Sequence, residues 1–109
     1  MSITPVLSLG ADSFAAFVSN AAQPVLVDFW APWCGPCRAL APKLEQLSHR
    51  FAGQLQVRKL NVDDAPDIAA SFGVRGIPML VLFKDGKPAS QLVGLHSEEQ
   101  LSEWVASAL

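Results

Sequence analysis

A short, almost continuous apolar run from Val25 to Trp30 is the feature that most constrains how this chain can fold. Apolar residues at successive positions, rather than at alternate ones, are typical of a strand that is buried on both faces. Such strands occur in parallel sheets that are covered by helices on both sides. Apolar residues with helical spacing lie on both sides of the run, so a helix is expected before it and another after it. The residues are Phe14, Phe17, Val18 and Ala21 before the run, and Leu40, Leu44, Leu47 and Phe51 after it. We therefore expect an α/β fold with helices on both faces of the sheet.

The middle of the chain continues this alternation of strands and helices. Residues 55–62 are typical of another strand, although the apolar phase shifts between Val57 and Leu60. A short helix with Ile68 and Phe72 on one face is expected after it. Because these strands are joined through helices, we expect right-handed crossovers and parallel pairing.

The last third of the chain predicts a hairpin followed by a helix. The segment Met79 to Phe83 is apolar throughout, and Asp85-Gly86 then supplies the signal of a tight turn. A more polar return strand over residues 89–93 is expected at an edge of the sheet. Ser97 to Gln100 matches a capping box before the final apolar stripe. The hairpin adds antiparallel strands, so the sheet should be mixed.

Composition excludes several classes of protein. A chain of 109 residues predicts one domain spanning residues 1–109, and with 50% hydrophobic and 17% charged residues it is not intrinsically disordered. The 8 Lys and Arg residues are fewer than the 10 Asp and Glu residues and form no basic run, which argues against binding nucleic acid. The first basic residue is Arg38, so a secretory signal is not expected. We expect a soluble, cytoplasmic monomer that does not span a membrane.

Two cysteines at the junction between the buried strand and the next helix carry the chemistry. Residues three apart at a helix start have Cβ atoms about 5–6 Å apart, close enough for a disulfide after a small adjustment. The unpaired N–H groups of the helix start favour a thiolate at Cys34, which lowers its pKa. Cys37 lies one turn further in and is suited to resolving a mixed disulfide. Pro36 fits the first turn because it has no N–H to leave unpaired.

Two other interpretations of the cysteine pair are weaker. A zinc site would need His49 and His96 as further ligands, and these histidines lack the close spacing of zinc motifs. A pair of inert buried thiols does not fit an exposed junction between strand and helix. The pair therefore favours reversible disulfide exchange, which needs neither a metal nor a bound cofactor.

Asp28 interrupts the apolar strand that leads to the cysteines. Alternation along the strand places it on the face of Leu26 and Trp30, beneath the helix that carries Cys37. Burial disfavours the carboxylate, so we expect a raised pKa. A proton acceptor for Cys37 and a structural carboxylate bonded to backbone or water are the two roles that this position allows.

Several motifs in the same order make the whole chain resemble the thioredoxin family. In chain order they are Val27 to Trp30, Trp30 to Arg38, Lys59 to Asp63, Arg75 to Pro78, Phe83 to Gly86 and Val93-Gly94. The resemblance implies the thioredoxin fold, a five-stranded mixed sheet of order 1-3-2-4-5 flanked by about four helices. It also implies a general protein-disulfide reductase, recharged by a thioredoxin reductase that depends on NADPH and a flavin.

The resemblance also implies roles for particular residues. Asp28 would take up the proton of Cys37 with Lys59 close to it, although Lys59 also fits a surface lysine with a buried stem. The Ile77-Pro78 bond would be cis and face the cysteines. The implied active-site motif and target groove comprise Trp33, Gly35, Pro36, Gly76, Ile77, Pro78 and Gly94. Met79 replaces the threonine often found after this proline, with no predicted direction of effect.

Two other functions remain open at this stage. One is a disulfide oxidant or isomerase on the same fold, although Gly35-Pro36 between the cysteines resembles the reducing members. The other is a binding subunit or folding factor that needs only the reduced surface of the protein. Replacing Cys34 by serine separates them from a reductase, because a pure binding role survives that change.

Overall fold

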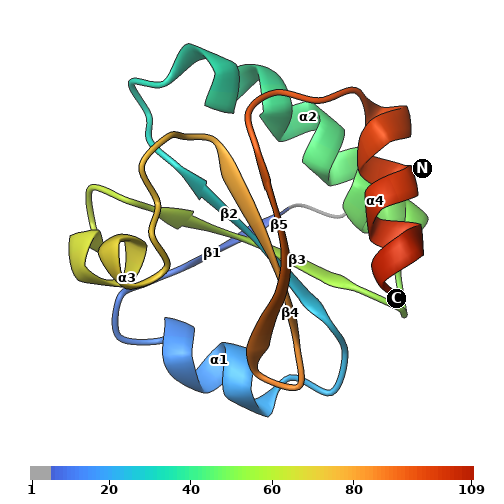
Figure 1. The fold of residues 1–109 in the computed structure, drawn as a ribbon, viewed down its shortest axis with the longest axis horizontal. Helices are drawn as coiled ribbons and strands as arrows, with labels where there is room; N and C mark the ends of the chain where they lie inside the picture. Colours follow the sequence, from blue (N-terminus) through green and yellow to red (C-terminus); the bar gives the residue numbers. More distant parts are fainter. Residues whose placement is uncertain (1–5) are drawn as a thin grey trace.

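The computed structural model describes residues 6–109, which form five strands and four helices, with the last two strands joined in the predicted hairpin (Figure 1). The elements are β1 (Leu7–Leu9), α1 (Phe14–Asn20), β2 (Val25–Trp30), α2 (Gly35–Arg50), β3 (Gln56–Asn61), α3 (Pro66–Ser71), β4 (Met79–Lys84), β5 (Lys87–Val93) and α4 (Glu98–Ala108). The apolar run from Val25 to Trp30 is β2, with the predicted bounds.

The five strands form one mixed sheet of order β1-β3-β2-β4-β5, which confirms the expected order. β3 pairs in parallel with both β1 and β2, whereas β4 runs antiparallel to β2 and to β5. β2 thus lies at the centre, which explains why its residues are apolar on both faces. In this register Asp28 lies opposite Lys59 on one side and Leu80 on the other.

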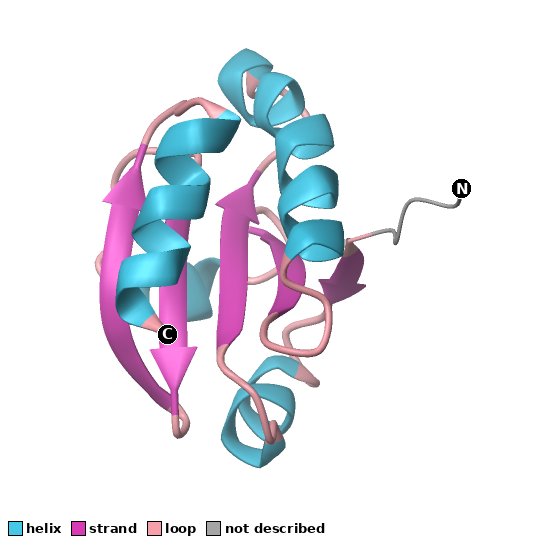
Figure 2. Cartoon of the chain, turned by 90° about the vertical axis from the view of Figure 1, so that its right-hand side faces the viewer, coloured by secondary structure: helices cyan, strands magenta, loops and turns pink. Residues whose placement is uncertain are grey.

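Helices cover both faces of the sheet (Figure 2). α2 and α4 pack on one face through a largely aliphatic cluster that contains Leu26 of β2 together with Leu40 and Leu44 of α2 and Leu101 of α4. α1 and α3 pack on the other face through a cluster that contains Val27 and Phe29. Successive β2 side chains therefore belong to different cores, as the pleat of a strand requires.

The phase shift predicted within residues 55–62 has a simple cause. Val57 packs into the aliphatic core under α2 and α4, whereas Leu60 packs into the core under α1 and α3. Between them, the Arg58 guanidinium lies 4.8 Å from the centre of the Phe17 ring. The buried apolar side chains of β3 therefore face α2 and α4 near the start of the strand and face α1 and α3 near its end.

The element boundaries differ from the predicted ones by a few residues. β5 starts at Lys87, two residues before the predicted return strand, and it forms the predicted edge. The capping box is present, since the Ser97 hydroxyl accepts from the Gln100 N–H and the Gln100 side chain accepts from the Ser97 N–H. Ser13 is the N-cap of α1, but its hydroxyl bonds Gly10 rather than the helix.

Candidate active site

The two cysteines meet at the start of α2, where the buried strand β2 has just ended. Cys34 is the N-cap of the helix, with extended backbone, and its Sγ accepts a hydrogen bond of 3.2 Å from the Cys37 N–H. A disulfide joins the pair, whose Cα atoms lie 5.2 Å apart. The Cys37 N–H has no acceptor within the helix and points instead at the Cys34 sulfur. This arrangement favours the thiolate form of Cys34 in the reduced protein.

The disulfide is shielded unequally. Cys34 is 6% exposed and Cys37 is 2% exposed, so the first cysteine is only slightly more accessible than the second. Both cysteines pack with Ala31, and Trp30, Val62 and Ile77 contact this small cluster. The expected difference in accessibility has the predicted sign, but both residues are more buried than the sequence suggests.

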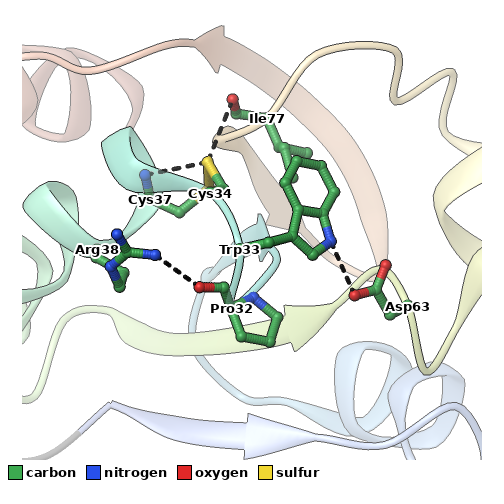
Figure 3. Close-up of a disulfide and its surroundings, with 7 residues drawn as sticks. All are labelled: Pro32, Trp33, Cys34, Cys37, Arg38, Asp63 and Ile77. Atoms are coloured by element: carbon green, nitrogen blue, oxygen red, sulfur yellow. Dashed lines mark hydrogen bonds between the residues drawn. A yellow bond between two sulfur atoms is a disulfide. The ribbon is translucent and has the colours of Figure 1, made fainter.

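The loop before β4 faces the disulfide from the other side (Figure 3). Ile77-Pro78 is a cis peptide bond, as the resemblance implies. The Ile77 carbonyl oxygen lies 3.8 Å from Cys34 Sγ. Pro78 accepts a 2.8 Å hydrogen bond from the Gly94 N–H, which ties the end of β5 to this loop. Gly94 has φ of +93°, a conformation that other residues rarely adopt.

Two segments distant in sequence, residues 30–37 and 76–78, therefore meet at the disulfide, and residues 93–94 lie against the second of them. A Cβ added to Gly76 would lie 3.8 Å from Val93, which is an ordinary distance, so packing does not require a glycine there. Gly35 is the first residue of α2 and a Cβ there would meet nothing within 4 Å, so packing does not require a glycine at this position. Pro36 occupies the first turn, as predicted.

Trp33 stands at the protein surface beside the cysteines. It is 68% exposed, yet its indole N–H donates a 3.0 Å hydrogen bond to the Asp63 carboxylate (Figure 3). The Asp63 N–H in turn donates to the Asn61 side chain. Sequence reasoning gave Asp63 no role. The sheet order could have revealed it, because the loops after β2 and β3 leave the same edge of adjacent parallel strands.

Asp28 lies below this surface, in the middle of the sheet. It is 3% exposed, and Oδ1 makes no hydrogen bond with any described residue. Burial raises the pKa of Asp28 to about 7, and the charge of Lys59 opposes this rise. Leu26, two residues earlier on the same face, packs beneath α2, so Asp28 also faces that helix. A carboxyl group with a pKa near neutrality can both accept and release a proton at physiological pH.

Lys59 lies next to Asp28 in the sheet and is half-buried. Its Nζ is 5.1 Å from the centre of the Trp30 ring, a geometry that favours a cation–π contact. The indole N–H of Trp30 is buried and has no hydrogen-bond partner among the described residues. Asp28, Trp30 and Lys59 thus lie side by side in β2 and β3, whereas Trp33 and Ile77 lie beside the disulfide.

Met79 does not belong to this surface. It is 3% exposed and packs in the core under α1 and α3. Any influence of Met79 on target choice would therefore act through packing and not through contact with a target.

Other kinds of site receive no support from the described chain. Within residues 6–109, no group of three or more His, Cys, Asp or Glu side chains could hold a metal ion. His96 bonds to the Val93 carbonyl oxygen through Nε2, and His49 lies near the far end of α2. No helix in the same range combines the length and apolar character that crossing a membrane requires.

Comparisons with known proteins agree with this geometry. The thioredoxin family model matches residues 5–107. A thioredoxin of Alicyclobacillus acidocaldarius is 51% identical over 80% of this chain and 83% of its own length. Thioredoxins of Acidithiobacillus ferridurans and Haemophilus influenzae are 44% and 43% identical over 95% and 94% of this chain, and each match covers 96% of the relative. With its paired cysteines at a helix start, this protein-disulfide oxidoreductase belongs to the thioredoxin family.

Proposed function

We propose that this chain reduces disulfide bonds in other proteins and that an NADPH- and flavin-dependent thioredoxin reductase restores its dithiol. The observation that carries the proposal is the Cys34–Cys37 pair at the start of α2, where a helix N–H reaches the Cys34 sulfur. The same arrangement in a redox protein permits rapid exchange, because the thiolate is the attacking species.

The reaction starts from the reduced protein. The Cys34 thiolate attacks one sulfur of the target disulfide, the target S–S bond breaks, and its other sulfur leaves as a thiolate that takes a proton. The Cys37 thiol then loses its proton, and its sulfur attacks Cys34 in the mixed disulfide. The second target thiolate leaves and is protonated. Two electrons and two protons have then passed to the target, and the Cys34–Cys37 bond has formed.

Asp28 is the proposed acceptor of the Cys37 proton. Its pKa of about 7 supports this role, because the carboxylate and the acid are then both populated near neutral pH. Lys59 is a positioning residue in this scheme, since its charge favours the carboxylate form of Asp28. A structural carboxylate remains the alternative, and it predicts no effect of Asp28 on exchange.

The proposed target groove lies beside Cys34. Trp33 and Val93 are exposed apolar residues near it, and the Ile77 carbonyl oxygen is close enough to Cys34 to meet a peptide bound there. An extended target segment can add to such a backbone edge like a strand. Gly76, Pro78 and Gly94 are the other proposed residues of this groove, and the Gly94 N–H donates a hydrogen bond to the Pro78 carbonyl oxygen.

We further propose that the protein acts as a monomer of one domain, residues 1–109, in the cytoplasm. A reductase of this kind needs a supply of NADPH, which favours a reducing compartment. Size-exclusion chromatography with light scattering tests the oligomeric state, and cell fractionation tests the compartment.

Reduction of insulin, followed in the presence of NADPH and thioredoxin reductase, tests the main proposal. We expect turnover with the wild-type protein, none with Cys34→Ser, and trapped mixed disulfides with Cys37→Ser. A binding subunit would keep its partner after Cys34→Ser. An oxidant or isomerase would show a higher equilibrium potential against glutathione and slow turnover with the reductase.

A further inference from the structure

Arg38 contacts the loop in front of the cysteines and has no role in the exchange described above. Its side chain leaves the first turns of α2, and its Nη1 donates a 2.8 Å hydrogen bond to the Pro32 carbonyl oxygen (Figure 3). A charged donor makes this a stronger bond than one between neutral groups. The bond joins the start of the helix to the loop that carries Trp33.

Residues 31–34 form a turn, because the Cys34 N–H donates to the Ala31 carbonyl oxygen at 3.1 Å. Pro32 and Trp33 are its two central residues. The peptide group between the central residues is the part of a turn that differs most between type I and type II, since it points to opposite sides. The Pro32 carbonyl belongs to that peptide group, so Arg38 holds the one group whose rotation would change the turn.

The conformation of Trp33 depends on this peptide group. A type II turn requires positive φ at its second central residue. Among the described residues other than glycine, only Asp85 has positive φ. Trp33 therefore has negative φ, which excludes a type II turn at residues 31–34. The indole of Trp33 is held at its outer end by Asp63. The peptide group before Trp33 is therefore contacted by Arg38, and the Trp33 side chain is contacted by Asp63.

We propose that Arg38 is a positioning residue for exchange with protein disulfides, acting as a clamp on the Pro32–Trp33 peptide group. The inference rests on the proposed function. The clamp keeps Trp33 and Cys34 in one arrangement when a target segment docks, so that the target sulfur meets the Cys34 sulfur without reordering of the loop. Small disulfides that do not rest on Trp33 gain little from it.

Three variants test the clamp. Arg38→Met removes the donor and the charge, and Arg38→Lys keeps the charge with a single ammonium donor. Arg50→Met is the matched control, because it makes the same change on the same helix, where Arg50 donates to the Ser102 hydroxyl. Initial rates of reduction are measured with insulin and with oxidised glutathione, at low salt and at high salt.

We expect Arg38→Met to reduce insulin about fivefold to tenfold more slowly and glutathione disulfide within about twofold of the wild-type rate, because misplacement affects the docked target most. Arg38→Lys should recover part of the loss, and the defect should persist at high salt, which screens an exposed charge. In nuclear magnetic resonance spectra, the Trp33 amide should show conformational exchange in Arg38→Met but not in Arg50→Met.

The clamp is wrong if Arg38→Met matches the wild-type protein on insulin. It is also wrong if Arg38→Met slows both substrates equally and Arg38→Lys or high salt removes the difference, because the charge alone would then act on the thiolate. These results differ from failure of the proposed function, in which the wild-type protein itself would not reduce insulin.

Discussion

The two faces of the sheet are built from different residues and do different work. The core under α1 and α3 is aromatic: the Phe14 ring centre lies 5.6 Å from that of Phe72 and 5.7 Å from that of Phe83, both edge-to-face. Phe29 lies 6.4 Å from Phe14 in the same cluster. The core under α2 and α4 is aliphatic, and the same face of the central strand carries Asp28.

Adjacent residues of one strand thus have opposite roles. Phe29 points into the aromatic core, and Asp28 points beneath the helix that carries the cysteines. In the described chain the buried polar residues are Asp28 and Ser48, and neither belongs to α1 or α3. We therefore expect the aromatic core to contribute mainly to stability, and we expect Asp28 on the α2 face to lower stability in return for its proposed role in proton transfer.

The largest expected effect lies on the aromatic face. Phe14→Ala removes a buried ring with three aromatic neighbours, so we expect the free energy of unfolding to fall by about 3–5 kcal/mol. The rate of insulin reduction per folded molecule should not change. Urea denaturation and exchange assays on the same samples measure both quantities.

Two further variants serve as controls for the comparison between the aromatic and the aliphatic core. Phe14→Leu keeps most of the volume and covers the case in which the alanine variant does not fold, with a smaller expected loss of about 1–2 kcal/mol. Leu44→Ala is the matched change in the aliphatic core and should cost about 2–5 kcal/mol. Slower exchange per folded molecule in Phe14→Leu would show that the aromatic face also serves the site.

The opposite sign is expected for Asp28→Asn. The neutral acid is favoured in the folded protein, so its contribution to stability is full below the unfolded pKa of about 3.9 and is lost as pH rises toward about 7. At pH 8 we therefore expect the oxidised Asp28→Asn variant to be more stable than the oxidised wild-type protein, with a free energy of unfolding that is higher by about 1–3 kcal/mol. Below pH 4 the two proteins should be equally stable.

The same substitution should slow exchange, because Cys37 loses its proton acceptor. We expect single-turnover reduction of insulin to fall about tenfold or more near neutral pH. If Asp28→Asn is less stable than the wild type at pH 8 and equally fast, Asp28 is a bonded structural carboxylate and the proposed proton transfer is wrong.

Much of the fold follows from patterns that act locally. The apolar run of β2 requires two covered faces, and the capping box sets the start of α4 at the predicted place. The start of β5 is less determined, because Lys87 and Pro88 are poor strand formers that join the sheet by pairing with β4. Tertiary pairing, which local propensity does not contain, extended the strand by two residues.

The site was predictable where one segment holds the chemistry and less so where segments meet. Cys34, Cys37 and Asp28 lie within ten residues of one another, and their positions follow from the strand and the helix start. The contact of Trp33 with Asp63 spans 30 residues, and it depends on which loops the sheet order brings together. The bond from Arg38 to Pro32 is local, but no pattern specifies where a long, exposed side chain will turn.

The smallest expected effect comes from Lys59→Met, which keeps an apolar stem over Trp30 and removes the charge. Because Lys59 lowers the pKa of Asp28, its removal should raise that pKa further, which carboxyl nuclear magnetic resonance can follow. Above neutral pH the folded carboxylate loses a favourable charge, so the variant should be less stable by up to about 1 kcal/mol.

The pH dependence separates this effect from the lost contact with Trp30. That contact does not depend on the protonation of Asp28, so its loss lowers stability equally at pH 4 and pH 8. The interaction with Asp28 disappears at pH 4, where the acid is neutral in the folded protein. We therefore expect a larger loss at pH 8 than at pH 4 in Lys59→Met, and no such difference in Lys87→Met at the exposed start of β5. Equal losses at both pH values would mean that Lys59 stabilises the protein only through its contact with the Trp30 ring. Lys59 would then not be a positioning residue for Asp28.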